Sequence, residues 1–218
     1  MIERDYIMRM INQLTRALAR ILMLKKEHQY AEALKEINTS GRTLLGVDLG
    51  MMHMFSDTQL LQLFGKDDTL EIPKCYILGL LLKEDAELLH LQGNEEQSLT
   101  TAMKSLSLLT ETYIRHAEPV EPGHIGHVDS VIEYLAGAGL PVELREKVFR
   151  FYAATGRYDK AEDCLFDLLE LSPSLRQEGI QFYTLLLEKA DEELERGNLP
   201  RDEVVQGLAD LQVRYPNI

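Results

Sequence analysis

The 218-residue chain contains no tryptophan and only two cysteines, Cys75 and Cys164. A disulfide framework or a zinc cluster needs more sulfur or imidazole ligands at close spacing, so neither organises this protein. Both cysteines lie within apolar stretches of helical period, where cysteine behaves as a small buried hydrophobic residue. This usage of cysteine fits a reducing cytoplasm.

Long hydrophobic runs are also missing. A membrane-spanning helix needs about 18 uncharged apolar residues, and the apolar run from Cys75 to Leu82 already ends at Lys83. The N-terminal apolar segment is interrupted by Arg16 and Arg20, which is unlike a signal peptide. We therefore expect a protein without a transmembrane segment, located in the cytoplasm.

Positive charge is scarce: 23 lysines and arginines face 36 acidic residues, and the net charge is −13. This balance excludes nucleic acid as the main partner, because binding to phosphates requires clustered basic residues. The charge is uneven, since residues 1–26 carry six basic and two acidic side chains, a net charge of +4. A basic first helix beside an acidic remainder is consistent with internal docking, with a protein partner or with an anionic surface.

The alternation of apolar and polar residues that marks strands is absent, and so are Asn-Gly and Asp-Gly hairpin turns. Nearly every segment instead has the apolar period of a helix, which predicts an all-α fold. Residues 6–24 are the first example, with one apolar stripe along the helix. The stripe consists of Ile7, Ile11, Leu14, Leu18 and Ile21, with Met10 and Leu22 alongside.

Capping residues and helix breakers set the ends of the predicted helices. Ser56 and Gln59 are spaced as a capping box, and Pro73 is placed to open a helix that runs to about Leu91. Residues 116–127 contain two prolines and two glycines, which predicts a loop. A helix is also predicted over residues 30–37, and the pattern leaves open whether it continues to residue 45. The other predicted helices cover residues 95–114, 128–135, 142–154, 158–171, 174–196 and 200–215.

The loop at residues 116–127 divides the chain roughly in half. It separates an N-terminal helical region, residues 1–115, from a C-terminal helical region, residues 128–218. A chain of this length forms one domain or two small ones, and we expect one continuous domain.

Residues 142–173 predict two helices that meet at a turn of small residues. Glycine ends the first helix in a left-handed conformation, and a small alanine lets the two helices approach closely. These residues resemble the tetratricopeptide repeat, and the resemblance implies antiparallel helix pairs stacked in an α-α superhelix. The Trp and Leu-Gly pattern in the first helix of that repeat is absent here. The matching positions are Tyr152, Gly156, Tyr158, Ala161, Leu165 and Pro173.

The whole chain also resembles a small bacterial family of unknown function. Its members open much like residues 5–11, Asp-Tyr-Ile-Met-Arg-Met-Ile, and carry a segment like residues 155–162, Thr-Gly-Arg-Tyr-Asp-Lys-Ala-Glu. The resemblance implies a cytoplasmic protein with a helical-repeat-like fold, and it implies no established activity.

No nucleophile signature, Gly-rich phosphate loop or dinucleotide fingerprint is present, so the sequence assigns no catalytic residue and no cofactor. The segment 116–129 gathers imidazoles and carboxylates, which divalent metals accept as ligands. A metal-dependent enzyme that uses this segment is an alternative hypothesis, although a solvated loop is the simpler interpretation because the segment has no His-Glu-x-x-His pattern. The candidate ligands are His116, Glu118, Glu121, His124, His127 and Asp129.

Other ionisable residues predict no site. Adjacent acids such as Glu84, Asp85 and Glu87 diverge around a helix, so they do not form an acid/base pair by themselves. The remaining histidines are expected on helix surfaces or in turns; they are His28, His53 and His90.

The favoured interpretation is a non-enzymatic helical protein that binds a protein or peptide partner against its helix faces. Arg145, Arg150 and Arg157 are candidate contacts to an acidic partner. The methionine-rich segment 51–55 is a further candidate, because exposed methionines adapt to different partners. The alternative is a basic N-terminal helix that forms a homodimer seam or docks on a membrane surface.

Overall fold

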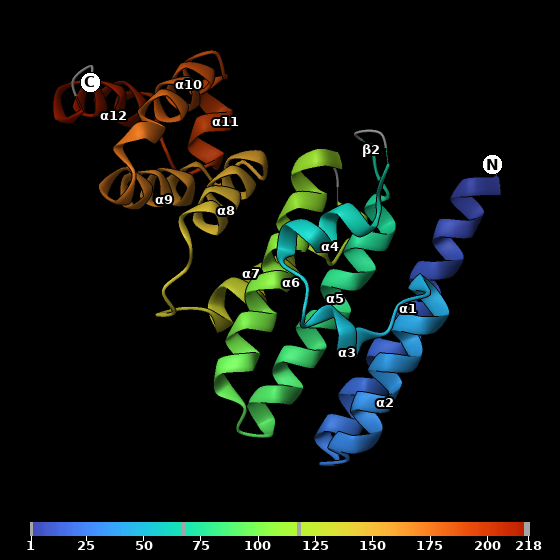
Figure 1. Ribbon diagram of the computed structural model, residues 1–218. Helices are drawn as coiled ribbons and strands as arrows, with labels where there is room; N and C mark the ends of the chain where they lie inside the picture. Colours follow the sequence, from blue (N-terminus) through green and yellow to red (C-terminus); the bar gives the residue numbers. More distant parts are fainter. Residues whose placement is uncertain (1, 67–68, 117–118, 216–218) are drawn as a thin grey trace. The chain divides into compact units, whose positions relative to one another are not determined.

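The computed structural model describes residues 2–66, 69–116 and 119–215 (Figure 1). The chain forms two compact units, residues 1–139 and residues 140–218. Apart from one pair of two-residue strands, the regular elements of the described residues are all helical. The all-α prediction is therefore confirmed.

The first unit begins with α1 (Ile2–Lys26), α2 (Tyr30–Ser40) and the π-helical turn η1 (Gly41–Leu45). α1 packs against α2 through the stripe that its sequence predicts. Leu14 and Ile21 of this stripe are buried, and so is Met10 beside it. Leu22, expected next to the stripe, is exposed. The apolar face of the first helix is thus used inside the chain.

Short elements follow: α3 (Leu49–Met52), α4 (Asp57–Leu63), β1 (Gly65–Lys66) and β2 (Thr69–Leu70). The capping box predicted at the start of α4 is present. The Gln59 amide donates to Ser56 Oγ (3.2 Å), and the Ser56 amide donates to Gln59 Oε1 (2.8 Å). The two strands pair antiparallel, with Gly65 opposite Leu70.

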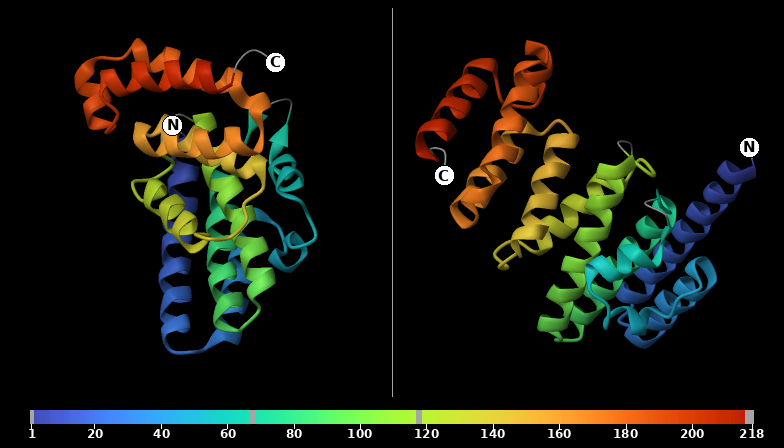
Figure 2. Two further views of the ribbon diagram at one scale, coloured as in Figure 1. Left: turned by 90° about the vertical axis from the view of Figure 1, so that its left-hand side faces the viewer. Right: turned by 45° about the horizontal axis from the view of Figure 1, so that its top comes forward.

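The core of the first unit is built on α5 (Ile72–Leu91), α6 (Glu95–His116) and α7 (His124–Tyr134). Residues 75–82 of α5 are buried on all sides of the helix, as expected for a helix that is apolar all round. α6 lies along α5 (Figures 1 and 2). The close approach requires Gly79, because a Cβ at this position would lie 2.8 Å from Leu109 Cδ2.

The predicted loop at 116–127 is shorter in the structure, because α7 begins at His124, four residues before the predicted start of this helix. α7 packs on α6 and buries Val128 and Val131. These contacts place α7 in the first unit, which ends at Gly139, whereas residues from 128 onward were expected in the C-terminal region.

The second unit contains α8 (Val142–Ala154), α9 (Tyr158–Leu171), the 3-10 turn η2 (Pro173–Leu175), α10 (Arg176–Leu187), α11 (Asp191–Arg196) and α12 (Arg201–Arg214). α8 packs on α9, and α10 packs on α12 (Figure 2). α8 and α9 have the predicted bounds. Gly156 between them has φ of 73°, the left-handed conformation that was predicted to end the first helix.

The prediction of a single helix over residues 174–196 is wrong. α10 ends at Leu187, and α11 begins at Asp191 after an extended Ala190 (φ −69°, ψ 149°). The guanidinium of Arg201 donates to Leu187 O (2.9 Å) and Lys189 O (2.5 Å). These bonds satisfy carbonyls that a continuous helix would have bonded within itself.

No helix within the described ranges is long and apolar enough to cross a membrane.

Candidate functional site

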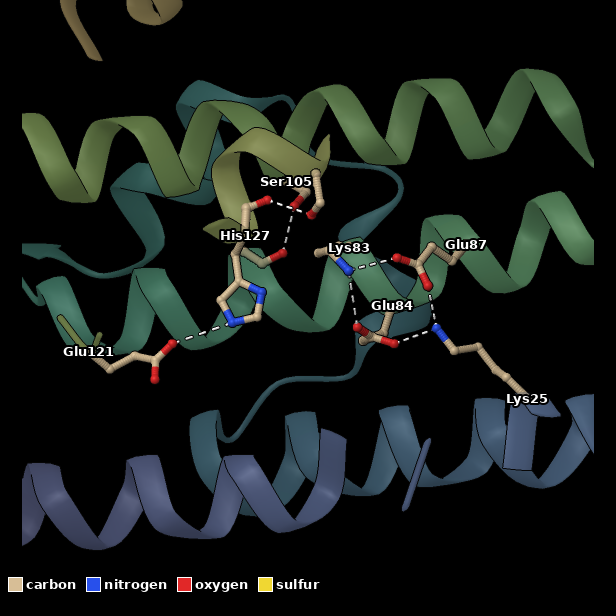
Figure 3. Close-up of polar contacts among 9 residues, drawn as sticks. Lys25, Lys83, Glu84, Glu87, Ser105, Glu121 and His127 are labelled. Atoms are coloured by element: carbon tan, nitrogen blue, oxygen red, sulfur yellow. Dashed lines mark hydrogen bonds and ion pairs between the residues drawn. The ribbon is translucent and has the colours of Figure 1, made fainter. Parts of the chain in front are cut away.

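The histidines of the predicted metal-binding segment lie in three different environments. His116 is exposed at the end of α6. His127 of α7 is half-buried, and its Nε2 lies 3.4 Å from Glu121 Oε1 (Figure 3). His124 is completely buried. Glu118 lies outside the described residues.

His124 has no nitrogen left for a metal ion. Its Nδ1 accepts from the Val120 amide (3.2 Å), and its Nε2 lies 3.0 Å from Leu109 O and therefore donates to it. Burial lowers the pKa of His124 to about 4, although the bond to Leu109 opposes this shift. The imidazole is thus neutral near pH 7, and it packs between the rings of Tyr76 and Tyr113.

Among the described residues, no group of three His, Cys, Asp or Glu side chains is arranged to hold a metal ion. Of the predicted ligands, Glu121 and His127 lie together, whereas both nitrogens of His124 bind other partners.

A ring of four charged side chains joins α1 to α5 (Figure 3). Lys25 Nζ lies 2.5 Å from Glu84 Oε2 and 2.5 Å from Glu87 Oε2. Lys83 Nζ lies 3.4 Å and 2.6 Å from the other oxygens of the same two glutamates. Burial alone would lower the pKa of Lys83, but the two glutamates outweigh it and raise the pKa. Each charge has two partners of opposite sign, so the ring fastens two helices and leaves no charge free for a ligand.

An open pocket of about 600 Å³ lies in the first unit where α5 turns into α6. His53, Thr101 and Lys104 line it together with the exposed residues 93–97. His53 follows α3, whereas Thr101 and Lys104 come from successive turns of α6. The pocket therefore joins segments about 50 residues apart in the chain.

His53 is held from both sides. Its Nε2 lies 2.9 Å from Asp85 Oδ2, and its Nδ1 lies 3.2 Å from Thr101 Oγ1. Asp85 Oδ2 is buried and makes no hydrogen bond to a described residue, so its approach to Nε2 is a close contact, whereas Nδ1 is hydrogen-bonded to the Thr101 hydroxyl. Carboxylate, imidazole and hydroxyl follow the order of a nucleophilic triad. Thr101 is only 1% exposed, however, so its hydroxyl is closed to a substrate.

Lys104 fixes the segment that carries His53. Its Nζ donates to His53 O (2.7 Å) and lies 3.5 Å from Met52 O. Within the described ranges it forms no ion pair with a carboxylate. Burial lowers the pKa of Lys104, and the charge of Asp57 only partly opposes this shift.

Two methionines on the same segment face solvent. Met51 is 51% exposed and Met54 is 75% exposed, whereas Met52 between them is buried. The anchoring of Met52 and His53 by Lys104 presents Met51 and Met54 on a fixed backbone. We call these two residues the methionine surface.

The repeat-defining residues of the second unit lie on α8, on α9 and in the turns that follow these helices. Tyr152 and Tyr158 are buried near the turn, and Gly156 provides its left-handed residue. Ala161 and Leu165 are buried along α9, and the amides of Tyr158 and Asp159 donate to Gly197 O at the end of α11. Pro173 opens η2.

The three candidate arginines each contact their own unit. Arg145 donates to Leu140 O (3.0 Å) and lies 4.0 Å from Asp167. Arg150 pairs with Glu146 and keeps 53% of its side chain exposed. Arg157 stacks over the rings of two aromatic residues, Phe151 and Tyr152.

A model described as a family of unknown function (DUF6483) matches residues 1–216. The chain belongs to this family. No curated protein and no solved structure matches the chain. The match agrees with the predicted resemblance to a family of unknown function, whereas the resemblance to the tetratricopeptide repeat stays a prediction.

Sequence reasoning missed the pocket because its residues are far apart along the chain. His53 was expected on a helix surface or in a turn, and it lies in a turn, but nothing near it in the sequence indicated Asp85 or Lys104 as neighbours. The available indication of the pocket was that adjacent acids on a helix point in different directions. On α5, Asp85 faces His53, whereas Glu84 and Glu87 face Lys25. The exposed methionines were indicated by their position beside a Gly-rich break.

Proposed function

We propose that this protein is a non-enzymatic helical scaffold that binds a protein or peptide partner, and that the methionine surface forms part of the binding site. The observation that carries the proposal is the exposure of Met51 and Met54 on a segment whose intervening residues are anchored. A flexible, polarisable thioether suits contact with partners of varied shape.

The anchoring matters for affinity. A surface that is already fixed before binding loses less conformational entropy when the partner arrives. His53 and Lys104 hold the backbone between the two methionines, so the thioether side chains are the main groups left to order. An amphipathic helix with an apolar face is the partner chemistry that this arrangement suits.

The second unit supports the scaffold proposal in a different way. We propose that α8–α9 and α10–α12 are successive antiparallel pairs of a tetratricopeptide-like superhelix. Gly179 of α10 supports this stacking, because a Cβ there would lie 3.3 Å from Leu165 of α9 and closer still to Leu211 of α12. In this arrangement Arg145, Arg150 and Arg157 remain the proposed contacts to an acidic partner, and Arg150 has the greatest proposed role because its side chain is half exposed.

We also propose a cytoplasmic location. The unpaired cysteines support it, because both are inert: burial raises the pKa of Cys75 to about 12 and that of Cys164 to about 11. Thiols of this kind neither need nor readily form disulfides.

The test is affinity capture from a lysate of the source organism with the intact protein and two variants. The variant Met51→Ser/Met54→Ser removes the methionine surface. The matched control, Met8→Ser/Met23→Ser, changes two methionines of α1 that are similarly exposed, at 55% and 57%. We expect one partner to be captured by the wild type and the control and lost with the first variant.

The captured partner is then purified and titrated against the same three proteins by fluorescence anisotropy. Removing two apolar anchors should weaken binding by about 10- to 100-fold. Equal affinity for all three proteins would remove the methionine surface from the site. If no partner binds any of them in purified form, the scaffold proposal itself is wrong.

A further inference from the structure

We propose that the pocket between His53 and Lys104 binds a small molecule through a carboxylate group. This proposal goes beyond the scaffold function and does not depend on it. It begins with Lys104, whose ammonium has three N–H donors. Two of them are directed at backbone carbonyls, at 2.7 Å and 3.5 Å, and no described carboxylate pairs with the remaining charge.

A half-buried cation without a paired anion is unfavourable, because burial removes water from the charge. Lys104 shows the consequence, since burial lowers its pKa. Asp57 is the acid that opposes the shift, but it accepts from Ser107 (2.8 Å) and does not line the pocket. A ligand carboxylate beside Lys104 would supply the missing negative charge and an acceptor for the free N–H.

The pocket has further groups suited to a polar ligand. The carboxamides of Asn94 and Gln97 line it together with Lys104, and each offers N–H donors. The imidazole of His53 also lines the pocket, with Nδ1 hydrogen-bonded to the Thr101 hydroxyl at 3.2 Å. The volume of about 600 Å³ lies within the range of small-molecule sites.

Two acidic residues in the lining affect which anion is accepted. Glu95 and Glu96 line the pocket, and Glu95 lies 2.7 Å from His90. Their negative charges repel any anion, and they repel a phosphate dianion about twice as strongly as a monocarboxylate. They attract an ammonium group on the ligand. The geometry therefore favours a monocarboxylate, and most of all one that also carries an amine.

The experiment is a titration of the uniformly ¹⁵N-labelled full chain, followed by amide chemical shifts. The probes are acetate, glycine and inorganic phosphate, each compared with sodium chloride at equal ionic strength. We expect saturable shifts at the amides of Gly93, Thr101 and Lys104, with Kd of about 1–10 mM for acetate and tighter binding of glycine. Phosphate should bind more weakly than acetate.

Variants separate the ligand contact from the structural role of Lys104. Lys104→Met should weaken acetate binding by about 10- to 100-fold, whereas Lys104→Arg keeps the charge and should retain most of it. Lys35→Met, at a lysine with 75% of its side chain exposed, is the matched control and should bind as the wild type does.

Two outcomes would overturn the proposal. The first is that neither acetate nor glycine shifts the pocket amides of the wild type beyond the sodium chloride control, a result that needs no variant to fold. The second is saturable binding of phosphate without binding of either carboxylate. The variant Met51→Ser/Met54→Ser should bind acetate normally, so failure of this proposal and failure of the scaffold proposal are distinguishable.

Discussion

His124 lies inside the first unit with no exposed surface and with both ring nitrogens engaged. Its neutral form fits this place, because Nδ1 must accept from the Val120 amide while Nε2 donates to Leu109 O. A second proton on Nδ1 would face the Val120 N–H instead of accepting from it. The structure therefore ties the stability of this region to the deprotonated state of one imidazole.

The first prediction is that the protein loses stability between pH 6.5 and pH 4. The folded pKa of His124 is depressed from 6.5 to about 4, so its contribution is present above the unfolded pKa and is lost as the pH falls towards the folded one. A shift of this size corresponds to roughly 3 kcal/mol of unfolding free energy. The measurement is urea unfolding followed by circular dichroism across this pH range.

The variant His124→Gln should be less stable than the wild type at pH 7 but less sensitive to pH below 6.5. Some sensitivity should remain, because burial also lowers the pKa of His127. His116→Gln, at an exposed histidine, should keep the wild-type profile. The same slope in wild type and His124→Gln would show that His124 is not the titrating group.

The burial of His124 could not be predicted from the sequence. His124 stands among prolines and glycines, which favours a solvated loop, and its burial depends on Tyr76, a residue 48 positions earlier. The local features could be predicted, because Ser56, Pro73 and Gly156 act through bonds or backbone angles within a few residues.

At the scale of elements, the ring of Lys25, Lys83, Glu84 and Glu87 is what fastens the last turn of α1 to α5 (Figure 3). Only 5% of the Lys25 side chain is exposed. Removing Lys25 leaves Lys83 as the one partner of both Glu84 and Glu87, so one negative charge of the ring loses its compensation, which costs more than an exposed ion pair contributes.

The second prediction is that Lys25→Met lowers the free energy of unfolding by about 2–4 kcal/mol. Lys26→Met, at the adjacent exposed lysine, should change it by less than about 0.5 kcal/mol. Chemical denaturation at pH 7 provides the measurement. The double variant Lys25→Met/Glu84→Gln should be more stable than Lys25→Met alone, because it also removes the uncompensated charge.

Equal losses at Lys25 and Lys26 would show that the ring contributes no more than surface charges do. Destabilisation of the double variant by the sum of its single effects would show the same, because independent sites add and coupled sites do not.

The ends of helices could be predicted where the local sequence contains residues that end a helix. α8 and α9 have the predicted bounds because glycine and proline mark their ends. The break between α10 and α11 carries no such mark, since Lys189 is a good helix former and Ala190 the best. It is imposed by Arg201, which lies more than ten residues away along the chain and takes the carbonyls of Leu187 and Lys189.

At the scale of the whole molecule, the two compact units follow from where each helix finds its buried contacts. The Pro/Gly-rich segment is the most irregular part of the sequence, so a division there was the natural expectation. α7 moves the boundary to Gly139, because this helix packs on α6. A Pro- and Gly-rich composition predicts where the chain turns, whereas the packing of the helices decides which of them belong to the same unit.

The third prediction is that residues 1–139 fold on their own and that residues 1–115 do so far less well. The longer fragment keeps every element of the first unit, including α7. The shorter one ends where the sequence suggested a boundary and loses Val128, Val131 and Leu135, all buried. At about 1.5–3 kcal/mol for each buried apolar side chain, the loss is about 5 kcal/mol or more, which is comparable to the whole stability of a domain.

Circular dichroism and urea unfolding of the two fragments provide the measurement. Residues 1–139 should unfold in one cooperative transition, and residues 1–115 should have a much lower midpoint or none. If the shorter fragment were as stable as the longer one, the boundary of the first unit would lie at residues 116–127. A longer fragment without a cooperative transition would show that the first unit needs the second in order to fold, because its own buried contacts would then be too few to offset the entropy of ordering the chain.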